Sequence, residues 1–159
     1  MTEFLTTCFY HTKLVGWLQV TVSEQGICAL SFVDSPLSSA MAPWPPLARH
    51  VMRELDAYFA GKLKVFSVPL EPLRGSAFQH RVWAELMSIP FGETRSYRDI
   101  AKALGNPGLA RAVGAANGAN PVPIIIPCHR VIRSDGTLGG YSSGIHIKKK
   151  LLAWEGNEV

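Results

Sequence analysis

The most informative stretch of this chain is residues 120–132, which read NPVPIIIPCHRVI. It places Cys128 at the end of an apolar run, directly before His129 and Arg130. A cysteine reacts as its thiolate, and neighbouring cationic groups favour that form. A buried structural cysteine is the alternative interpretation. The prolines of the stretch and the charged pair that follows the cysteine are unusual in a core strand, so the pattern favours a reactive cysteine.

The rest of the chain has the composition of a globular protein, with 47% hydrophobic and 18% charged residues among 159. That length suffices for one ordinary domain or two small ones. Apolar runs stay shorter than the roughly 18 residues of a membrane span, so no membrane partner is expected. The first residues do not resemble a secretion signal, and three cysteines do not make a disulfide framework. We therefore expect a cytoplasmic protein, or a nuclear one in a eukaryote.

Charge is unevenly distributed along the chain, whose formal net charge is +4. Residues 1–74 carry six Lys or Arg and six Asp or Glu, so they balance. Residues 75–159 carry ten basic and six acidic side chains, which is the whole excess. A basic half beside a neutral half suggests that the second half faces a polyanion. Ordinary surface charge is the alternative.

The first half of the chain has the pattern of a small sheet with one helix. Its predicted elements are a hairpin of residues 18–22 and 28–32, a loop over 35–46, a helix over 47–59 and a further strand over 63–70. The hairpin follows from apolar residues at every second position, and the helix from apolar residues at helical spacing after two prolines. The link to a second unit is expected at residues 71–75.

The second half has a helical pattern. Ser76 and Gln79 are spaced as a capping box, which predicts a helix that ends before Pro90. Ser96 is placed to cap a short helix through Leu104. After a tight turn, another helix is predicted from about residue 107 to 117. Two short helices joined by such a turn are typical of a helix-turn-helix, although a plain helical corner has the same pattern.

The second helix of that pair, residues 109–117, consists almost entirely of small residues around Arg111. Its Gly114 costs about 1 kcal/mol in a helix relative to alanine. A helix surface without bulky side chains lets a backbone approach another molecule closely. Nucleic acid and a closely packed neighbouring helix are both compatible with this composition.

These motifs together resemble the O6-alkylguanine-DNA alkyltransferase family. The resemblance is carried by Pro127–Ile132 preceded by Asn120–Pro123, and by Ser96–Tyr97, Ala110–Gly114, Gly139–Ser142 and Leu151–Gly156. It spans residues 75–156 and is weaker over residues 1–70. It implies an α/β N-terminal domain (a small β-sheet with a helix, residues 1–73). A mostly α, winged-helix-like domain with a helix-turn-helix would follow over residues 74–159.

The resemblance also implies the roles of five catalytic residues. Cys128 would be the alkyl acceptor, His129 would deprotonate it through a water, and Glu155 would orient the imidazole. This is the usual order of nucleophile, base and orienting group. Tyr97 would sit by the target phosphate and donate a proton or hydrogen bond to the departing guanine. Asn120 would be the hinge that joins the DNA-reading helix to the active-site segment.

Further residues acquire roles in binding by the same resemblance. Arg111 would enter the duplex and replace the extruded base in the stack. The remaining DNA-binding residues would be Tyr97, Ala110, Ala112, Gly114 and Arg130. The main chain at Cys128 and Val131 would read the guanine amine, the amide of Ser142 would meet the alkylated oxygen, and Tyr141 would line the pocket.

The implied function is DNA repair by a protein that acts once. It would take the alkyl group from O6-alkylguanine, and from O4-alkylthymine, in double-stranded DNA approached through the minor groove, after the nucleotide has been rotated out of the helix. We expect a monomer that needs no cofactor. Some relatives hold zinc, and Cys8, His11 and Cys28 could supply three ligands, but residues 63–74 contain no Cys or His. No metal is therefore expected.

Three other functions are compatible with parts of this pattern. A non-catalytic relative that senses alkylguanine has tryptophan at the cysteine position, whereas this chain has Cys128. A cysteine hydrolase using Cys128 and His129 would need two adjacent side chains aimed at each other and would leave the DNA-binding pattern unexplained. A transcriptional regulator would need side chains that read base edges, which the helix of small residues lacks.

Overall fold

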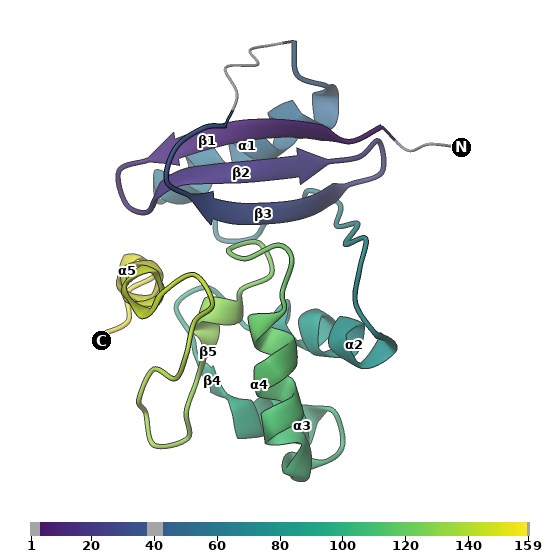
Figure 1. Cartoon of the computed structure of the whole chain (residues 1–159). Helices are drawn as coiled ribbons and strands as arrows, with labels where there is room; N and C mark the ends of the chain where they lie inside the picture. Colours follow the sequence, from purple (N-terminus) through teal and green to yellow (C-terminus); the bar gives the residue numbers. More distant parts are fainter. Residues whose placement is uncertain (1–3, 38–42, 159) are drawn as a thin grey trace. The chain divides into compact units, whose positions relative to one another are not determined.

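The computed structural model describes residues 4–37 and 43–158. Contacts within the chain divide it into two compact units, residues 1–74 and 75–159. The first unit consists of a sheet and a helix, and the second is mainly helical (Figure 1). The loop expected over residues 35–46 lies partly outside the described residues.

The first unit contains a three-stranded antiparallel sheet. Its strands are β1 (Thr6–Thr12), β2 (Gly16–Val22) and β3 (Ile27–Val33), hydrogen-bonded in the order β1-β2-β3. Helix α1 (Pro46–Phe59) packs against the sheet (Figure 1). Leu18 and Val20 of β2 are buried with Val51 and Leu55 of α1. The alternating apolar residues therefore form the core, as the hairpin and helix patterns predicted.

The prediction of a strand over residues 63–70 is wrong. Only Leu70 forms an isolated bridge, to Ile27. The segment is held by a side chain, because the buried carboxylate of Glu54 accepts from the backbone N–H groups of Ser67 at 2.9 Å and Val68 at 2.8 Å. These N–H groups have a partner without a neighbouring strand, so the apolar spacing of the segment does not produce one.

The second unit is built from short helices. They are α2 (Ala77–Leu86), α3 (Tyr97–Ala103), α4 (Ala110–Gly118) and α5 (Ile145–Trp154), with 3-10 turns η1 (Pro107–Leu109) and η2 (Cys128–Arg130). Two short strands, β4 (Arg95–Ser96) and β5 (Val131–Ile132), pair in parallel. The predicted helix-turn-helix corresponds to α3, η1 and α4.

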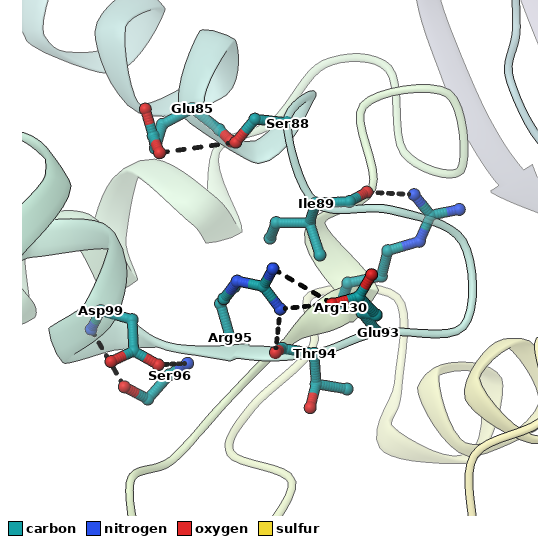
Figure 2. Close-up of polar contacts among 9 residues, drawn as sticks. All are labelled: Glu85, Ser88, Ile89, Glu93, Thr94, Arg95, Ser96, Asp99 and Arg130. Carbon is teal, nitrogen blue, oxygen red and sulfur yellow. Dashed lines mark hydrogen bonds and ion pairs between the residues drawn. The ribbon is translucent and has the colours of Figure 1, made fainter.

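Local sequence rules explain where α2 and α3 begin. The Ser76 hydroxyl accepts from the Gln79 N–H at 3.1 Å, and the Gln79 side chain accepts from the Ser76 N–H at 2.8 Å. Ser96 and Asp99 make the equivalent reciprocal bonds at 3.0 and 2.9 Å, which Figure 2 shows as the pair nearest the start of α3. Each box satisfies two backbone N–H groups that a helix end leaves free.

The small residues of α4 serve two surfaces. Val113 and Ala116 are buried, and the carbonyl of Ala116 accepts from the indole N–H of Trp83 at 2.8 Å, which ties α4 to α2. Arg111 and Ala112 on the same helix are exposed. Close helix packing and an open face therefore coexist on α4, so the two interpretations of its composition are compatible.

Candidate active site

Cys128 begins η2 at the end of the buried run and is only 4% exposed. Burial is the largest influence on its thiol and raises its pKa. Hydrogen bonding from Asn120 and Tyr141, followed by the positive charge of Lys148, acts in the opposite direction and lowers this pKa. The charge that favours the thiolate therefore comes from Lys148, not from the neighbouring Arg130 as the sequence suggested.

Asn120 fixes the segment that leads to Cys128. Its side-chain N–H donates to the carbonyl of Ile126 at 2.8 Å, and its oxygen accepts from the N–H of Val122 at 2.9 Å. Between these anchors, Ile124 has a φ of +73°. A left-handed conformation costs a branched residue about 1–3 kcal/mol and persists only where the surroundings enforce it. Asn120 supplies that enforcement at the end of α4, which is compatible with the expected hinge.

His129 and Glu155 form a buried pair. The ring Nε2 of His129 lies 3.0 Å from a carboxylate oxygen of Glu155, and both side chains have no exposed surface. Burial, the largest influence, lowers the pKa of His129 and favours the neutral ring. When Nε2–H donates to the carboxylate, Nδ1 is left as an acceptor. Within residues 4–37 and 43–158, Nδ1 has no hydrogen-bond partner.

Arg130 does not lie where the sequence prediction, which gave it a role in DNA binding, expects it. Its side chain is 7% exposed, and its guanidinium donates to both carboxylate oxygens of Glu155, at 2.7 and 2.8 Å. A further donor reaches the carbonyl of Ile89 at 2.7 Å, a contact that Figure 2 shows. These bonds engage the guanidinium inside the unit. Arg130 therefore holds the Glu155 carboxylate in place and does not face a ligand.

A pocket of about 680 Å³ gathers most of the other predicted residues. Its walls include Tyr97, Ala110, Arg111, Gly114, Tyr141 and Ser142. Ala112, on α4, does not line it. Cys128 does not line the pocket, but one wall residue reaches it: the side chain of Asn117 donates to the Cys128 carbonyl at 3.2 Å. The pocket therefore joins the exposed face of α4 to the buried thiol.

Tyr97 depends on a glycine across the pocket. Gly139 has a φ of +71°, and a β-carbon at this position would lie 2.9 Å from the Tyr97 hydroxyl oxygen. Any larger residue would displace the phenol. Burial is the main reason that the pKa of Tyr97 is raised, with the charge of Cys128 acting in the same direction and Arg133 opposing it. The phenol therefore keeps its proton and can donate a hydrogen bond.

Lys148 is a functional residue that the sequence interpretation missed. Its side chain is buried, and its ammonium donates to the carbonyls of Val131 at 2.7 Å, Leu138 at 2.6 Å and Gly140 at 3.2 Å. It also lies 5.9 Å from the centre of the Tyr97 ring. Burial, the largest influence, lowers its pKa to about 8. Lys148 thus holds the loop that carries the pocket wall.

The signal for Lys148 was present in the helical spacing. The run Lys148–Lys150 has the composition of a solvated surface. Residues 148, 151, 152 and 155, however, lie three and four apart, which places them on one face of a helix. The first three are buried on α5, and Glu155 at its end is buried too. A lysine on an apolar face, one turn from an apolar pair, could have been singled out.

Replacing Lys148 by methionine is expected to slow alkylation of Cys128 by iodoacetamide at neutral pH by about tenfold or more. The pocket loop loses three hydrogen bonds. The pKa of Cys128 rises because the positive charge of Lys148 no longer stabilises the thiolate, and each pKa unit corresponds to about 1.36 kcal/mol. The pH dependence of Cys128 alkylation by iodoacetamide checks this, since the variant should need a higher pH. An unchanged pH profile would remove Lys148 from the control of the thiol. Lys149→Met, exposed on the same helix, is the matched control.

No metal centre accompanies this site in the part of the chain that the structure describes. Those residues contain no group of three or more His, Cys, Asp or Glu side chains that could hold a metal ion. Cys8 and Cys28 are buried cysteines of the first unit that form no disulfide.

No helix in the described ranges is long and apolar enough to cross a membrane.

Comparison with known families matches both halves of the chain. The 6-O-methylguanine DNA methyltransferase DNA-binding domain matches residues 77–157, and the ribonuclease-like domain of the same family matches residues 6–72. Two similar relatives are named methylated-DNA–protein-cysteine methyltransferase. The one from Mycolicibacterium paratuberculosis is 46% identical over 89% of this chain and 87% of its own length. The one from Methanosarcina barkeri is 45% identical over 91% and 94%.

Solved structures agree with this relationship. A crystal structure of the Mycobacterium tuberculosis O6-methylguanine methyltransferase has a TM-score of 0.82 and 41% identity, covering 96% of this chain and 93% of that one. A crystal structure of OGT from the same organism in complex with DNA has a TM-score of 0.82 and 43% identity, covering 94% and 92%. The resemblance noted in the sequence is confirmed: this chain belongs to the 6-O-methylguanine DNA methyltransferase family.

Proposed function

We propose that this protein repairs O6-alkylguanine in double-stranded DNA by moving the alkyl group onto Cys128 in one irreversible step. The observation that carries the proposal is the connection between a buried thiol and the exposed face of α4. Asn117 lines a pocket whose rim carries Arg111, and its side chain donates to the Cys128 carbonyl at 3.2 Å. A DNA-facing helix and a reactive thiol at one pocket are what direct transfer from DNA to protein requires.

The proton leaves the thiol before or during attack. His129 Nδ1 is the base, and a water carries the proton to it from Cys128, while Glu155 holds the ring by its other nitrogen. The sulfur then forms a bond to the alkyl carbon as the bond from that carbon to O6 breaks. The electron pair stays on guanine, and the Tyr97 hydroxyl donates a hydrogen bond to the ring as charge develops there. The thioether is stable, so each molecule acts once.

The reacting base must leave the helix first, because a thiol that is 4% exposed cannot reach into a stack. Rotating a nucleotide out costs a few kcal/mol, and less for a mispaired alkylguanine. The exposed small residues of α4 let its backbone approach the minor groove, where contacts with little base reading suit a search through any sequence. Arg111 fills the gap in the stack.

Guanine is recognised by the main chain around the nucleophile. The carbonyl of Cys128 already accepts from Asn117, and that of Val131 from Lys148. A carbonyl oxygen has two lone pairs, so each can also accept from the guanine amine. The backbone N–H of Ser142 faces the alkylated oxygen. O4-alkylthymine lacks this amine and is a weaker second substrate.

The two units have different roles. The second unit, from residue 74 or 75 onward, holds the whole reaction site, and residues 1–73 form a separate α/β domain. The proposed catalytic residues all lie in the second unit, and we expect the protein to act as a monomer. It acts in the compartment that contains the DNA, the cytoplasm or, in a eukaryote, the nucleus, where its thiols stay reduced.

Replacing Arg111 by alanine tests the DNA part of this proposal. Methyl transfer from an O6-methylguanine duplex should fall by about ten- to a hundredfold, because the variant no longer offsets a few kcal/mol of unstacking. Transfer from free O6-benzylguanine, which needs no rotation, should change little. Both rates are measured as label bound to protein. Lys150→Ala, the same charge loss on an exposed position of α5, should alter neither. Equal losses in both assays would contradict the role of Arg111.

A further inference from the structure

A second hollow, of about 540 Å³, adjoins the active-site pocket in the second unit. Its lining consists of Tyr97, Arg98, Pro107, Gly108, Ala110, Arg133 and Ser134. Three of these, Tyr97, Ala110 and Arg133, also line the active-site pocket. The two cavities therefore share one rim. We call the second one the arginine hollow.

Two separate elements bring its arginines together. Arg98 stands in the first turn of α3, directly after Tyr97, and Arg133 follows β5. The parallel pairing of β4 with β5 places Ser96 opposite Ile132. The residues that follow the two strands therefore start from neighbouring positions. Both arginine side chains belong to exposed residues. Their meeting depends on the fold, since they are 35 positions apart in the sequence.

The charge of the arginine hollow is unbalanced. No carboxylate lines it, and none lines the active-site pocket. Among the described residues Arg98 makes neither an ion pair nor a side-chain hydrogen bond. Arg133 lies near Asp135 and Tyr97: hydrogen bonds from Thr137 are the main reason that the pKa of Asp135 is lowered, with the charge of Arg133 adding to them, and the same charge opposes the rise that burial causes in the pKa of Tyr97. The Asp135 carboxylate is itself engaged by the N–H and hydroxyl of Thr137, at 2.9 and 2.6 Å.

Neighbouring cations on the same side of the unit are compensated more fully. Arg95 pairs with Glu93 at 3.2 Å and donates to the Thr94 carbonyl at 2.9 Å, and Figure 2 shows its guanidinium turned toward both. Lys102 lies close enough to Asp99 to lower the pKa of that carboxylate, although the hydrogen bonds from Ser96 are the larger cause. Arg98, unlike Arg95, thus has no acidic partner among the described residues.

We propose that Arg98 and Arg133 hold the phosphodiester backbone of the strand that carries the reacting nucleotide, where it leaves the active-site pocket. This rests on the proposed function. Arginine binds phosphate oxygens through its planar fork of donors, and the Ser134 hydroxyl adds a further donor. A strand whose base enters the pocket crosses the shared rim at Tyr97 and Ala110. It therefore passes directly into the arginine hollow.

The arginine pair positions DNA without reading sequence, because contacts to phosphate carry no base information. It also has a mechanical consequence. A backbone held beside the pocket keeps the rotated nucleotide from swinging back, in addition to the support that Arg111 gives inside the stack. The pair therefore matters for duplex substrates and not for a free base.

Arg98→Gln provides the test, with Lys102→Gln as the control on the same helix. Lys102 is also exposed and loses the same charge, but it does not line the arginine hollow. Binding to an O6-methylguanine duplex is measured at several salt concentrations. Each phosphate contact contributes about 0.9 to the slope of log affinity against log salt. Arg98→Gln should lower that slope by about 0.9, so its deficit shrinks about threefold to fourfold between 50 and 200 mM salt.

Neutral methylphosphonate linkages locate the contact. Placed one at a time on either side of the lesion, they should weaken wild-type binding at one or two positions by about tenfold, since a charge-assisted contact is lost. The same linkages should not weaken the Arg98→Gln protein further, whereas Lys102→Gln should respond like the wild type. Arg133→Gln should lose sensitivity at the same or the adjacent linkage.

The outcomes separate this proposal from the function on which it rests. Equal salt slopes for the two variants, or a neutral linkage that weakens Arg98→Gln as much as the wild type, would overturn the arginine contact while leaving alkyl transfer intact. A wild-type protein that takes no alkyl group from the duplex would overturn the proposed function itself. Transfer from free O6-benzylguanine by Arg98→Gln should match the wild type, which also checks that the variant is folded.

Discussion

Replacing Cys128 by serine is expected to abolish alkyl transfer, by at least about a thousandfold, while duplex affinity stays within about twofold. A serine hydroxyl is a far weaker nucleophile than a thiolate and needs stronger activation than a neutral imidazole acting through water provides. The side chains have nearly the same shape, so the pocket and the face of α4 should persist. Label transfer from an O6-methylguanine duplex and binding of that duplex measure the two quantities separately.

Cys28→Ser supplies the matched control, because Cys28 is also a buried cysteine outside any disulfide. It should transfer at the wild-type rate. Cys8 is not a competitor either, since burial alone raises its pKa to about 11. Loss of both transfer and DNA binding in Cys128→Ser would mean that the serine had disturbed the fold. Residual transfer to Cys128→Ser protein would place the acceptor elsewhere.

Replacing Glu155 by glutamine is expected to cost about 3–5 kcal/mol of folding free energy, the usual result of removing one partner of a buried ion pair. The Arg130 guanidinium would keep its bond to Ile89 but lose a carboxylate that accepts at 2.7 and 2.8 Å. His129 would lose the group that orients its ring, so transfer should fall as well. Urea unfolding measures the stability change.

Glu93→Gln is the control for this prediction. Glu93 also pairs with an arginine, Arg95 at 3.2 Å, but the two side chains are 53% and 38% exposed. Such a surface pair contributes about 0–1 kcal/mol. Should Glu155→Gln fail to fold, Glu155→Gln combined with Arg130→Met removes both charges and should recover part of the loss. Equal costs for Glu93→Gln and Glu155→Gln would contradict the structural role of the buried pair.

Local rules explain which parts of the fold were predictable. Capping boxes act over three residues and alternation acts over two, so the starts of α2 and α3 and the β2–β3 hairpin followed from neighbouring positions. Strand β1 was not predicted, because its TTCFYHT sequence lacks clear alternation. The predicted strand over 63–70 was wrong because Glu54, distant in sequence, takes its backbone donors.

The same distinction between local and distant contacts applies to the site residues. The acceptor, its base and the hinge were named through the motif around Cys128, and most of the predicted pocket residues do line one cavity. Burial of charge was harder to derive: helical spacing with two buried leucines could have singled out Lys148, but no local pattern shows the partners of Arg130. The sequence interpretation put Arg130 on the DNA and overlooked Lys148, because a charged side chain is expected outside unless tertiary partners are known. In both cases the partners are buried carbonyls or a carboxylate from other segments.

The central claim is that Cys128, and no other group, accepts one alkyl group per molecule. The most direct measurement is the intact mass of the protein after exposure to excess O6-benzylguanine, followed by peptide mapping. The account predicts that every molecule gains one benzyl group, on the peptide that contains Cys128, and then stays inert. An unmodified protein, an adduct on Cys8 or Cys28, or release of more than one equivalent of guanine per molecule would contradict it.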